Sequence, residues 1–157
     1  MTNQELPFTA YPGGGRELLK RRPGWNTRRS DGPEFMQITG AKSCAYCGLD
    51  MTGDFDNWLT MVLDHVVPVS VCQKMGIDGS LAWNYSNTVL ACGACNGFCN
   101  RYEPKEISSA PTTLTEFYDL RDRIFAERWE QIHARREEEQ KFFETKPWIP
   151  KHSQTTL

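Results

Sequence analysis

Two cysteine pairs, Cys44-Ala-Tyr-Cys47 and Cys92-Gly-Ala-Cys95, bracket the run Val62-Leu-Asp-His-Val-Val-Pro-Val-Ser70, and Asn96 follows the second pair directly. A Cys-x-x-Cys turn places two thiolates on one side of a tight bend. Two such turns can close a tetrahedral site of four sulfurs that suits Zn2+. Such a site holds a fold together and keeps no open position for chemistry. The spacing therefore predicts a structural zinc site.

The alternative for these four thiols is a pair of disulfides or free thiols. The first residues, Met-Thr-Asn-Gln-Glu, show no basic segment followed by an apolar stretch, so we expect neither secretion nor membrane insertion, and we expect a cytoplasmic location. A reducing cytoplasm favours metal over disulfides. Cys72 and Cys99 have no partner at this spacing and are expected to be ordinary buried or free thiols.

Composition and charge set wider limits. A chain of 157 residues with 39% hydrophobic and 24% charged residues is typical of one globular domain with extensions. The net charge of −2 argues against a protein that coats nucleic acid through bulk charge. Residues 1–42 hold seven Lys and Arg against four acids, whereas residues 43–103 hold six acids and two bases. The acidic centre suits a cation, and the basic arm could supply phosphate contacts.

We expect residues 1–42 to form an irregular basic arm that packs on the core. Breaks such as Gly32-Pro33 leave one short helical candidate, Arg16–Arg22. Trp25 and Phe35 are the expected anchors, because large aromatic side chains seldom stay exposed singly without some use in packing.

Residues 43–103 are expected to form the core. The expected elements are an extended run from Leu59 that Pro68 ends, a helical turn or two over Val69–Met75, a loop over Gly76–Ser80, an extended piece over Asn87–Leu90, and a helix after Cys92 that Glu103-Pro104 stops.

Residues 104–157 are expected to form a long helix and a tail. Thr113-Leu-Thr-Glu116 is a capping-box pattern. Apolar residues recur after it at steps of three and four, namely Phe117, Leu120, Ile124, Phe125, Trp129 and Ile132. We interpret this helix as a scaffold laid against the core, and the chain after Lys146-Pro147 as a tail.

The central run also carries chemistry. An imidazole with an ordinary pKa near ~6.5 can take a proton from water at neutral pH, and His65 is the histidine between the cysteine pairs. Asp64 offers a hard oxygen ligand for Mg2+, and Asn96 offers a neutral amide oxygen. Each residue alone has an ordinary explanation, since a His beside an Asp is often a hydrogen-bonded pair and an Asn often caps a helix. These three residues and Asn87 all fall in one stretch of chain that a zinc ion would fold into a compact unit. Taken together, they favour metal-dependent hydrolysis of a phosphodiester.

The pattern C-x2-C, D-H-V-x-P-x-S, N-x2-L-x-C-x2-C-N resembles the HNH endonuclease family over Ser43 to Arg101. The resemblance implies an α+β fold, in which a zinc-stapled, treble-clef-like ββα-metal core carries the irregular N-terminal arm and the long C-terminal helix. It implies a DNA substrate, Mg2+ or Mn2+ as the catalytic ion, and products with 5′-phosphate and 3′-hydroxyl ends. The implied roles are His65 as general base, Asp64 and Asn96 as catalytic-metal ligands, Asn87 as the residue that orients the base, and Cys44, Cys47, Cys92 and Cys95 as structural zinc ligands.

The sequence departs from the family pattern at one position near the site. Where family members often carry a basic residue, this chain has Cys99, so Asn100 and Arg101 are candidate phosphate or metal contacts. Two other functions stay open: a non-catalytic zinc-stapled module that binds DNA or protein, and a scaffold that works through the C-terminal helix. Neither predicts metal-dependent nicking.

Overall fold

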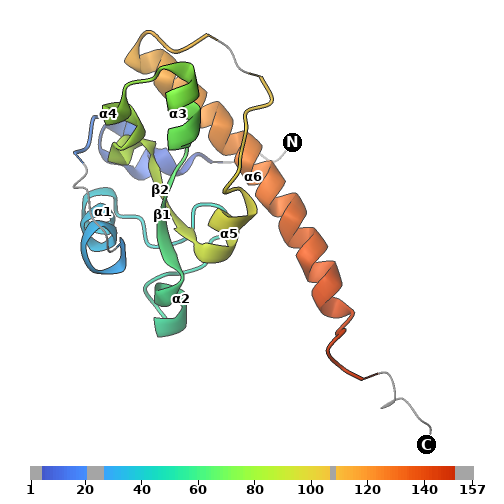
Figure 1. The fold of residues 1–157 in the computed structure, drawn as a ribbon. Helices are drawn as coiled ribbons and strands as arrows, with labels where there is room; N and C mark the ends of the chain where they lie inside the picture. The colour runs from blue at the N-terminus through green and yellow to red at the C-terminus, as the bar shows by residue number, and fades with distance from the viewer. Residues whose placement is uncertain (1–4, 21–26, 107–108, 151–157) are drawn as a thin grey trace, which may run out of the picture.

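The computed structural model describes residues 5–20, 27–106 and 109–150. In this part of the chain, helices surround a two-stranded sheet (Figure 1). The elements in order are η1 (Pro7–Ala10), η2 (Pro12–Gly15), η3 (Thr27–Asp31), α1 (Gly32–Thr39), α2 (Phe55–Leu59), β1 (Met61–His65), α3 (Val69–Met75), α4 (Gly79–Ala82), η4 (Tyr85–Asn87), β2 (Thr88–Cys92), α5 (Gly93–Phe98) and α6 (Leu114–Glu144). The fold is thus mixed helix and sheet, as the sequence predicts.

The sheet is an antiparallel pair in which Met61 lies opposite Cys92 and His65 lies opposite Thr88. Residues 66–87 leave β1, form α3, α4 and η4, and return into β2. Every residue of β2 is buried, because the strand is covered on both faces. The first cysteine turn joins the sheet through a hydrogen bond of 2.8 Å from the Ala45 amide to the Leu90 carbonyl. The predicted extended segments and the predicted helix over Val69–Met75 are confirmed, except that the first segment begins at Met61, because Leu59 is the last residue of α2.

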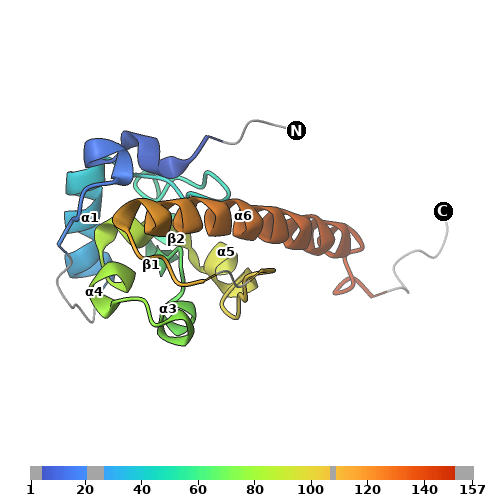
Figure 2. The same ribbon diagram turned by 90° about the horizontal axis from the view of Figure 1, so that it is seen from above.

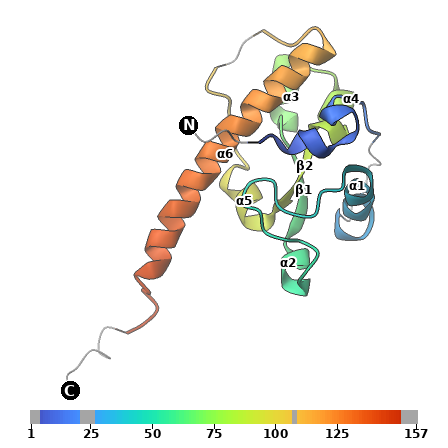
Figure 3. The same cartoon turned by 180° about the vertical axis from the view of Figure 1, so that it is seen from behind.

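Helix α6 begins at the predicted capping box, in which Thr113 and Glu116 each bond the other's backbone amide. Its apolar stripe is buried as expected, except that Trp129 is only partly covered. Phe125 stacks on Tyr46 of the first cysteine turn, with ring centroids 5.2 Å apart. Figures 2 and 3 show the helix passing along the sheet and extending beyond the rest of the molecule. Neither α6 nor any other helix in the described ranges is long and apolar enough to cross a membrane.

The N-terminal arm packs on the core through a chain of aromatic rings. Phe8 contacts Tyr11 and Phe125 edge-on, and Tyr11 in turn contacts Phe35. Phe35 is fully buried, which confirms it as an anchor, while Trp25 lies outside the described residues.

Four other boundaries differ from the sequence-based expectations. Gly32-Pro33 begins α1 instead of breaking the chain, because proline suits the first turn of a helix, where an amide hydrogen has no partner. In the described part of Arg16–Arg22, residues 16–20 are not helical, because the backbone of Leu19 bonds outward to Asn84 and Tyr85. Residues 99–104 are not helical either, since α5 ends at Phe98.

A fourth boundary lies in the expected loop over Gly76–Ser80. Helix α4 begins there at Gly79, because the Asp78 carboxylate accepts a hydrogen bond from the Ser80 amide and caps the first turn.

Candidate metal centre and catalytic site

The four cysteines of the two turns gather into one cluster. Their sulfur atoms all lie within 4.8 Å of one another, and the Cys47 and Cys92 sulfurs are 3.9 Å apart. An ion about 2.3 Å from each of four tetrahedral sulfurs would place those sulfurs about 3.8 Å apart. The spacing fits a metal ion and is far too long for disulfides, whose S–S bond is about 2 Å. The group can therefore hold one metal ion.

Local backbone structure explains how the cluster forms. The turn at Cys44 is closed by hydrogen bonds of the Cys44 amide to the Leu49 carbonyl and of the Gly48 amide to the Cys44 carbonyl. Gly48 has a φ of 76°, a conformation that a residue without a Cβ adopts without strain. The second turn lies where β2 passes into α5, and the Cys92 sulfur caps that helix by accepting from the Cys95 amide at 3.4 Å.

The charges of the cluster also favour a cation. Hydrogen bonds from Cys44 and then Cys95 lower the pKa of Cys92 to about 2, whereas hydrogen bonding to Cys92 raises the pKa of Cys44 to about 11. The pKa of Cys95 is raised by its contacts with the Cys44 and Cys92 side chains. Four adjacent thiolates repel one another unless a cation lies between them. Arg136 on α6 adds a positive charge, with its Nη1 3.8 Å from the Cys95 sulfur.

Helix α6 holds the first cysteine turn by a second contact that sequence reasoning did not predict. His133 Nε2 donates a hydrogen bond of 2.7 Å to the Tyr46 carbonyl, within the Cys44–Cys47 turn. The imidazole stacks on Trp129 with ring centroids 3.6 Å apart. These contacts make α6 part of the framework around the four cysteines.

Asp64, the expected metal ligand, is 7% exposed and faces α6. Its Oδ2 accepts a hydrogen bond of 2.7 Å from the Tyr46 hydroxyl and lies 2.8 Å from Nη2 of Arg128. The sequence predicts that this carboxylate is a ligand for Mg2+, and in the structure one of its oxygens belongs to a buried ion pair. Both contacts use Oδ2, so the role of Asp64 as a metal ligand stays a prediction that now rests on Oδ1.

His65 is the last residue of β1 and is partly exposed. Its ring meets the ring of Trp83 edge-on, with centroids 4.7 Å apart, and Trp83 is itself 49% exposed at the end of α4. Because side chains alternate along a strand, His65 points to the face opposite Asp64. The imidazole therefore lies at the rim of the sheet, beside an aromatic ring that solvent can reach.

Asn87 fixes the chain just after His65. Its Nδ2 donates to the carbonyls of Val67 and Ala82, both at 3.0 Å, and its Oδ1 accepts from the Val67 amide at 3.0 Å. Its backbone carbonyl also accepts from the Val66 amide at 2.9 Å. Asn87 is fully buried, and its side chain thus orients the residues next to the candidate base through their backbone.

The remaining candidates lie on or after α5, which packs against both strands. Asn96 is partly exposed on that helix, and Asn100 and Arg101 are exposed beyond its end. Asp64 and His65 are consecutive at the end of β1 and direct their side chains to opposite faces, Asn87 binds the backbone of the next residues, and Asn96 lies on the neighbouring helix. The joint binding of an ion by Asp64 and Asn96 stays a prediction, as do the roles of Asn100 and Arg101.

The main residue that sequence reasoning missed is Arg128. Its signal was present, because Arg121 and Arg128 are charged residues seven apart on the stripe that otherwise carries Ile124 and Phe125. A charged residue on the buried face of an amphipathic helix needs a partner in the core. The partner of Arg128 is Asp64.

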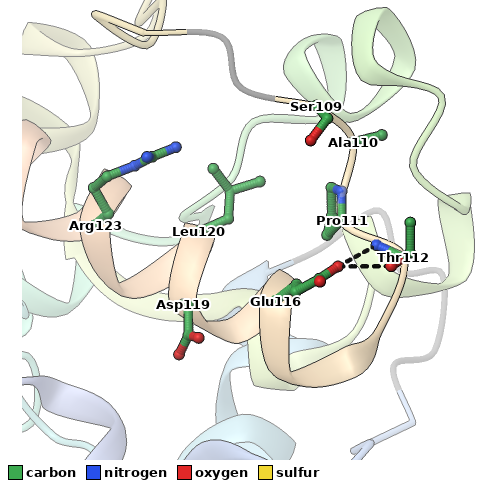
Figure 4. A pocket seen from close by; sticks show the side chains of 8 residues that line it. All are labelled: Ser109, Ala110, Pro111, Thr112, Glu116, Asp119, Leu120 and Arg123. Carbon is green, nitrogen blue, oxygen red and sulfur yellow. Dashed lines mark hydrogen bonds between the residues drawn. The ribbon is translucent and has the colours of Figure 1, made fainter.

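One hollow on the surface lies away from these residues. It has a volume of about 450 Å³ at the start of α6 and is lined by residues that include Pro111, Asp119 and Arg123 (Figure 4). The Glu116 carboxylate there bonds the amide and hydroxyl of Thr112. The polar groups of Thr112 and Glu116 serve the helix cap, and we assign the hollow no function.

The chain matches no protein-family profile, no curated protein and no solved structure. A functional assignment therefore depends on the residues and their geometry.

Proposed function

We propose that this protein is a metal-dependent endonuclease of the HNH type that hydrolyses phosphodiester bonds of DNA. The observation that carries the proposal is the arrangement at the end of β1. There the Asp64-His65 pair is followed directly by a segment that the Asn87 side chain holds through both backbone groups of Val67. This arrangement lies on an antiparallel strand pair that is joined to a four-cysteine cluster.

In this proposal His65 acts as the general base. It accepts a proton from a water molecule in line with the phosphorus, and its position at the strand end leaves the ring partly open to solvent. Asp64, through Oδ1, and Asn96 would hold Mg2+ or Mn2+. The bound ion would neutralise the charge on the phosphate and stabilise the departing 3′ oxygen. The products would carry 5′-phosphate and 3′-hydroxyl ends.

The four cysteines would hold Zn2+ with a structural role. Four thiolates complete a tetrahedral site, which leaves no position for substrate. Because thiolates persist as metal ligands in a reducing environment, a cytoplasmic location is part of the proposal.

DNA contact is assigned to the basic arm and to Arg101. Arg16 lies 3.6 and 3.8 Å from carboxylate oxygens of Asp119 and Asp122, so its charge is partly neutralised. Arg28 and Arg29 are exposed, and Arg28 lies over the ring of Trp58 at 5.7 Å. A positive charge beside a partly exposed aromatic ring suits a phosphate next to a base or sugar.

The test is a nicking assay with purified protein, supercoiled plasmid and single-stranded DNA, in Mg2+, Mn2+ or chelator, alongside zinc analysis. The proposal predicts one zinc ion per chain and cleavage only with added Mg2+ or Mn2+. Asp64→Ala should abolish cleavage and leave the zinc content unchanged. Zinc-loaded protein that cleaves neither substrate with either ion contradicts the proposal.

A second function, a zinc-stapled binding module without catalysis, is favoured by the surroundings of Asp64. One carboxylate oxygen is paired with Arg128, and strand alternation directs His65 to the opposite face. This function predicts zinc binding and DNA or protein binding without nicking, so the same assay separates the two.

A further inference from the structure

Helix α6 places one guanidinium against the end of β1. Arg128 is 1% exposed, and its Nη2 lies 2.8 Å from Oδ2 of Asp64. Its Nη1 donates to the carbonyls of His65 at 2.8 Å and Val66 at 3.0 Å. One side chain thus contacts the candidate metal ligand, the candidate base and the residue after it.

Arg128 and Asn87 form hydrogen bonds with different backbone groups of residues 65–67. Arg128 binds the carbonyls of His65 and Val66, and Asn87 binds the amide of Val66 and both polar groups of Val67. The chain that carries the imidazole is therefore held from two sides, by residues from two distant parts of the sequence.

A buried arginine is costly unless its donors are used, and the Nε of Arg128 has no partner in the described part of the chain. An apolar residue would fill this position on the stripe at lower cost. The planar fork of a guanidinium, however, can bind a carboxylate and two carbonyls at fixed angles, which an apolar residue cannot do.

We propose that Arg128 is a positioning residue of the nuclease site, which fixes the Asp64 carboxylate and the His65–Val66 backbone so that Oδ1 and the imidazole keep their places. The proposal rests on the proposed function. It extends the site beyond the cysteine-bounded segment and makes α6 part of it, because loss of Arg128 would release both groups at once.

Arg121 provides a matched control. It lies seven residues earlier on the same helix, is also 1% exposed, and binds two backbone carbonyls, those of Gly15 and Ser86. Its contact with Gly15 secures the N-terminal arm and its contact with Ser86 holds the chain just before β2, and neither contact involves Asp64 or His65. Loss of Arg121 therefore reports the general cost of removing a buried guanidinium from α6.

The experiment compares the nicking rates of the full-length parent, Arg128→Gln, Arg128→Lys and Arg121→Gln at saturating Mn2+. Circular dichroism and zinc content select a temperature at which all four are folded. Groups that orient metal ligands typically contribute 10- to 100-fold, so Arg128→Gln should lose about that factor. Arg121→Gln should lose much less. Arg128→Lys should recover part of the rate, because an ammonium keeps the charge opposite Asp64 but cannot span both carbonyls.

Equal rates for the parent and Arg128→Gln would overturn the role of Arg128 and leave the nuclease proposal standing. Equal losses of nicking rate in Arg128→Gln and Arg121→Gln, with no recovery in Arg128→Lys, would also overturn the role of Arg128, because they indicate a general effect on packing. A parent protein that does not nick would overturn both proposals.

Discussion

The side-chain amide of Asn87 and the backbone of Val67 form a closed pair of hydrogen bonds, each 3.0 Å long, across 20 residues of sequence. The same amide reaches the Ala82 carbonyl, so one buried side chain joins both ends of the segment between the strands. Residues 66–87 are anchored at the point where β1 ends and the candidate base lies.

Replacing Asn87 with alanine should destabilise the protein by about 2–4 kcal/mol, because buried backbone groups of Val67 and Ala82 lose their partners. Urea unfolding followed by circular dichroism measures the change. The control is Asn57→Ala on α2, which is more exposed and should change stability by no more than about 0.5 kcal/mol. Similar stability in both variants would contradict the anchoring role of Asn87.

Breaking the Asp64–Arg128 pair from one side should be more harmful than replacing it entirely. Asp64→Leu leaves a buried guanidinium unpaired and should cost about 3–5 kcal/mol. The double variant Asp64→Leu with Arg128→Met should recover much of that stability, since apolar groups of similar size tolerate burial. It should still fail to nick plasmid, because the proposed metal ligand is absent. A stable double variant that nicks at the parental rate would show that Asp64 has only a structural role.

Replacing Cys95 with serine should remove the metal ion and unfold the region around both cysteine turns. Structural zinc supplies folding free energy directly, and a serine hydroxyl does not replace a thiolate ligand. Metal analysis and circular dichroism measure both effects. Cys72→Ser is the control, because Cys72 lies on α3, away from the cluster. Zinc content that is unchanged in Cys95→Ser would contradict the four-sulfur site.

Trp83 should affect the reaction more than the stability. Its ring packs edge-on against His65 and is half exposed. Trp83→Ala therefore removes an aromatic contact of the imidazole but little of the packing in the core. We expect a loss of nicking of about tenfold and a change in unfolding free energy of about 1 kcal/mol or less. Trp83→Phe keeps an aromatic ring and should retain most of the activity. Equal activity in Trp83→Ala and the parent would remove Trp83 from the site.

Features that depend on short-range rules were predictable from the sequence. The Cys-x-x-Cys spacing predicts the cluster, because each turn needs only its own four residues. The capping box at Thr113 predicts the start of α6, and the apolar residues that recur after it at steps of three and four predict its course. The two strands were predictable because each is a short run of mainly apolar residues with a clear limit. Pro68 follows the first run, and the cysteine turn at Cys92 follows the second.

The surroundings of the candidate site were not predictable in the same way. Asp64 and Arg128 are 64 positions apart, and only the packing of α6 on the sheet brings them together. The sequence shows a charged residue on an apolar stripe but does not identify its partner. The arm differed from expectation for a similar reason, because Leu19 bonds to a distant segment instead of to its own helical neighbours.

The most direct test of the central claim is the rate at which His65→Ala nicks supercoiled plasmid in saturating Mn2+, compared with the parent at equal zinc content. Replacement of a general base lowers the rate by about 100- to 10,000-fold, and we predict a loss of that size without a change in zinc or helix content. A folded, zinc-loaded His65→Ala protein that nicks at the parental rate would contradict the assignment of His65 as the base.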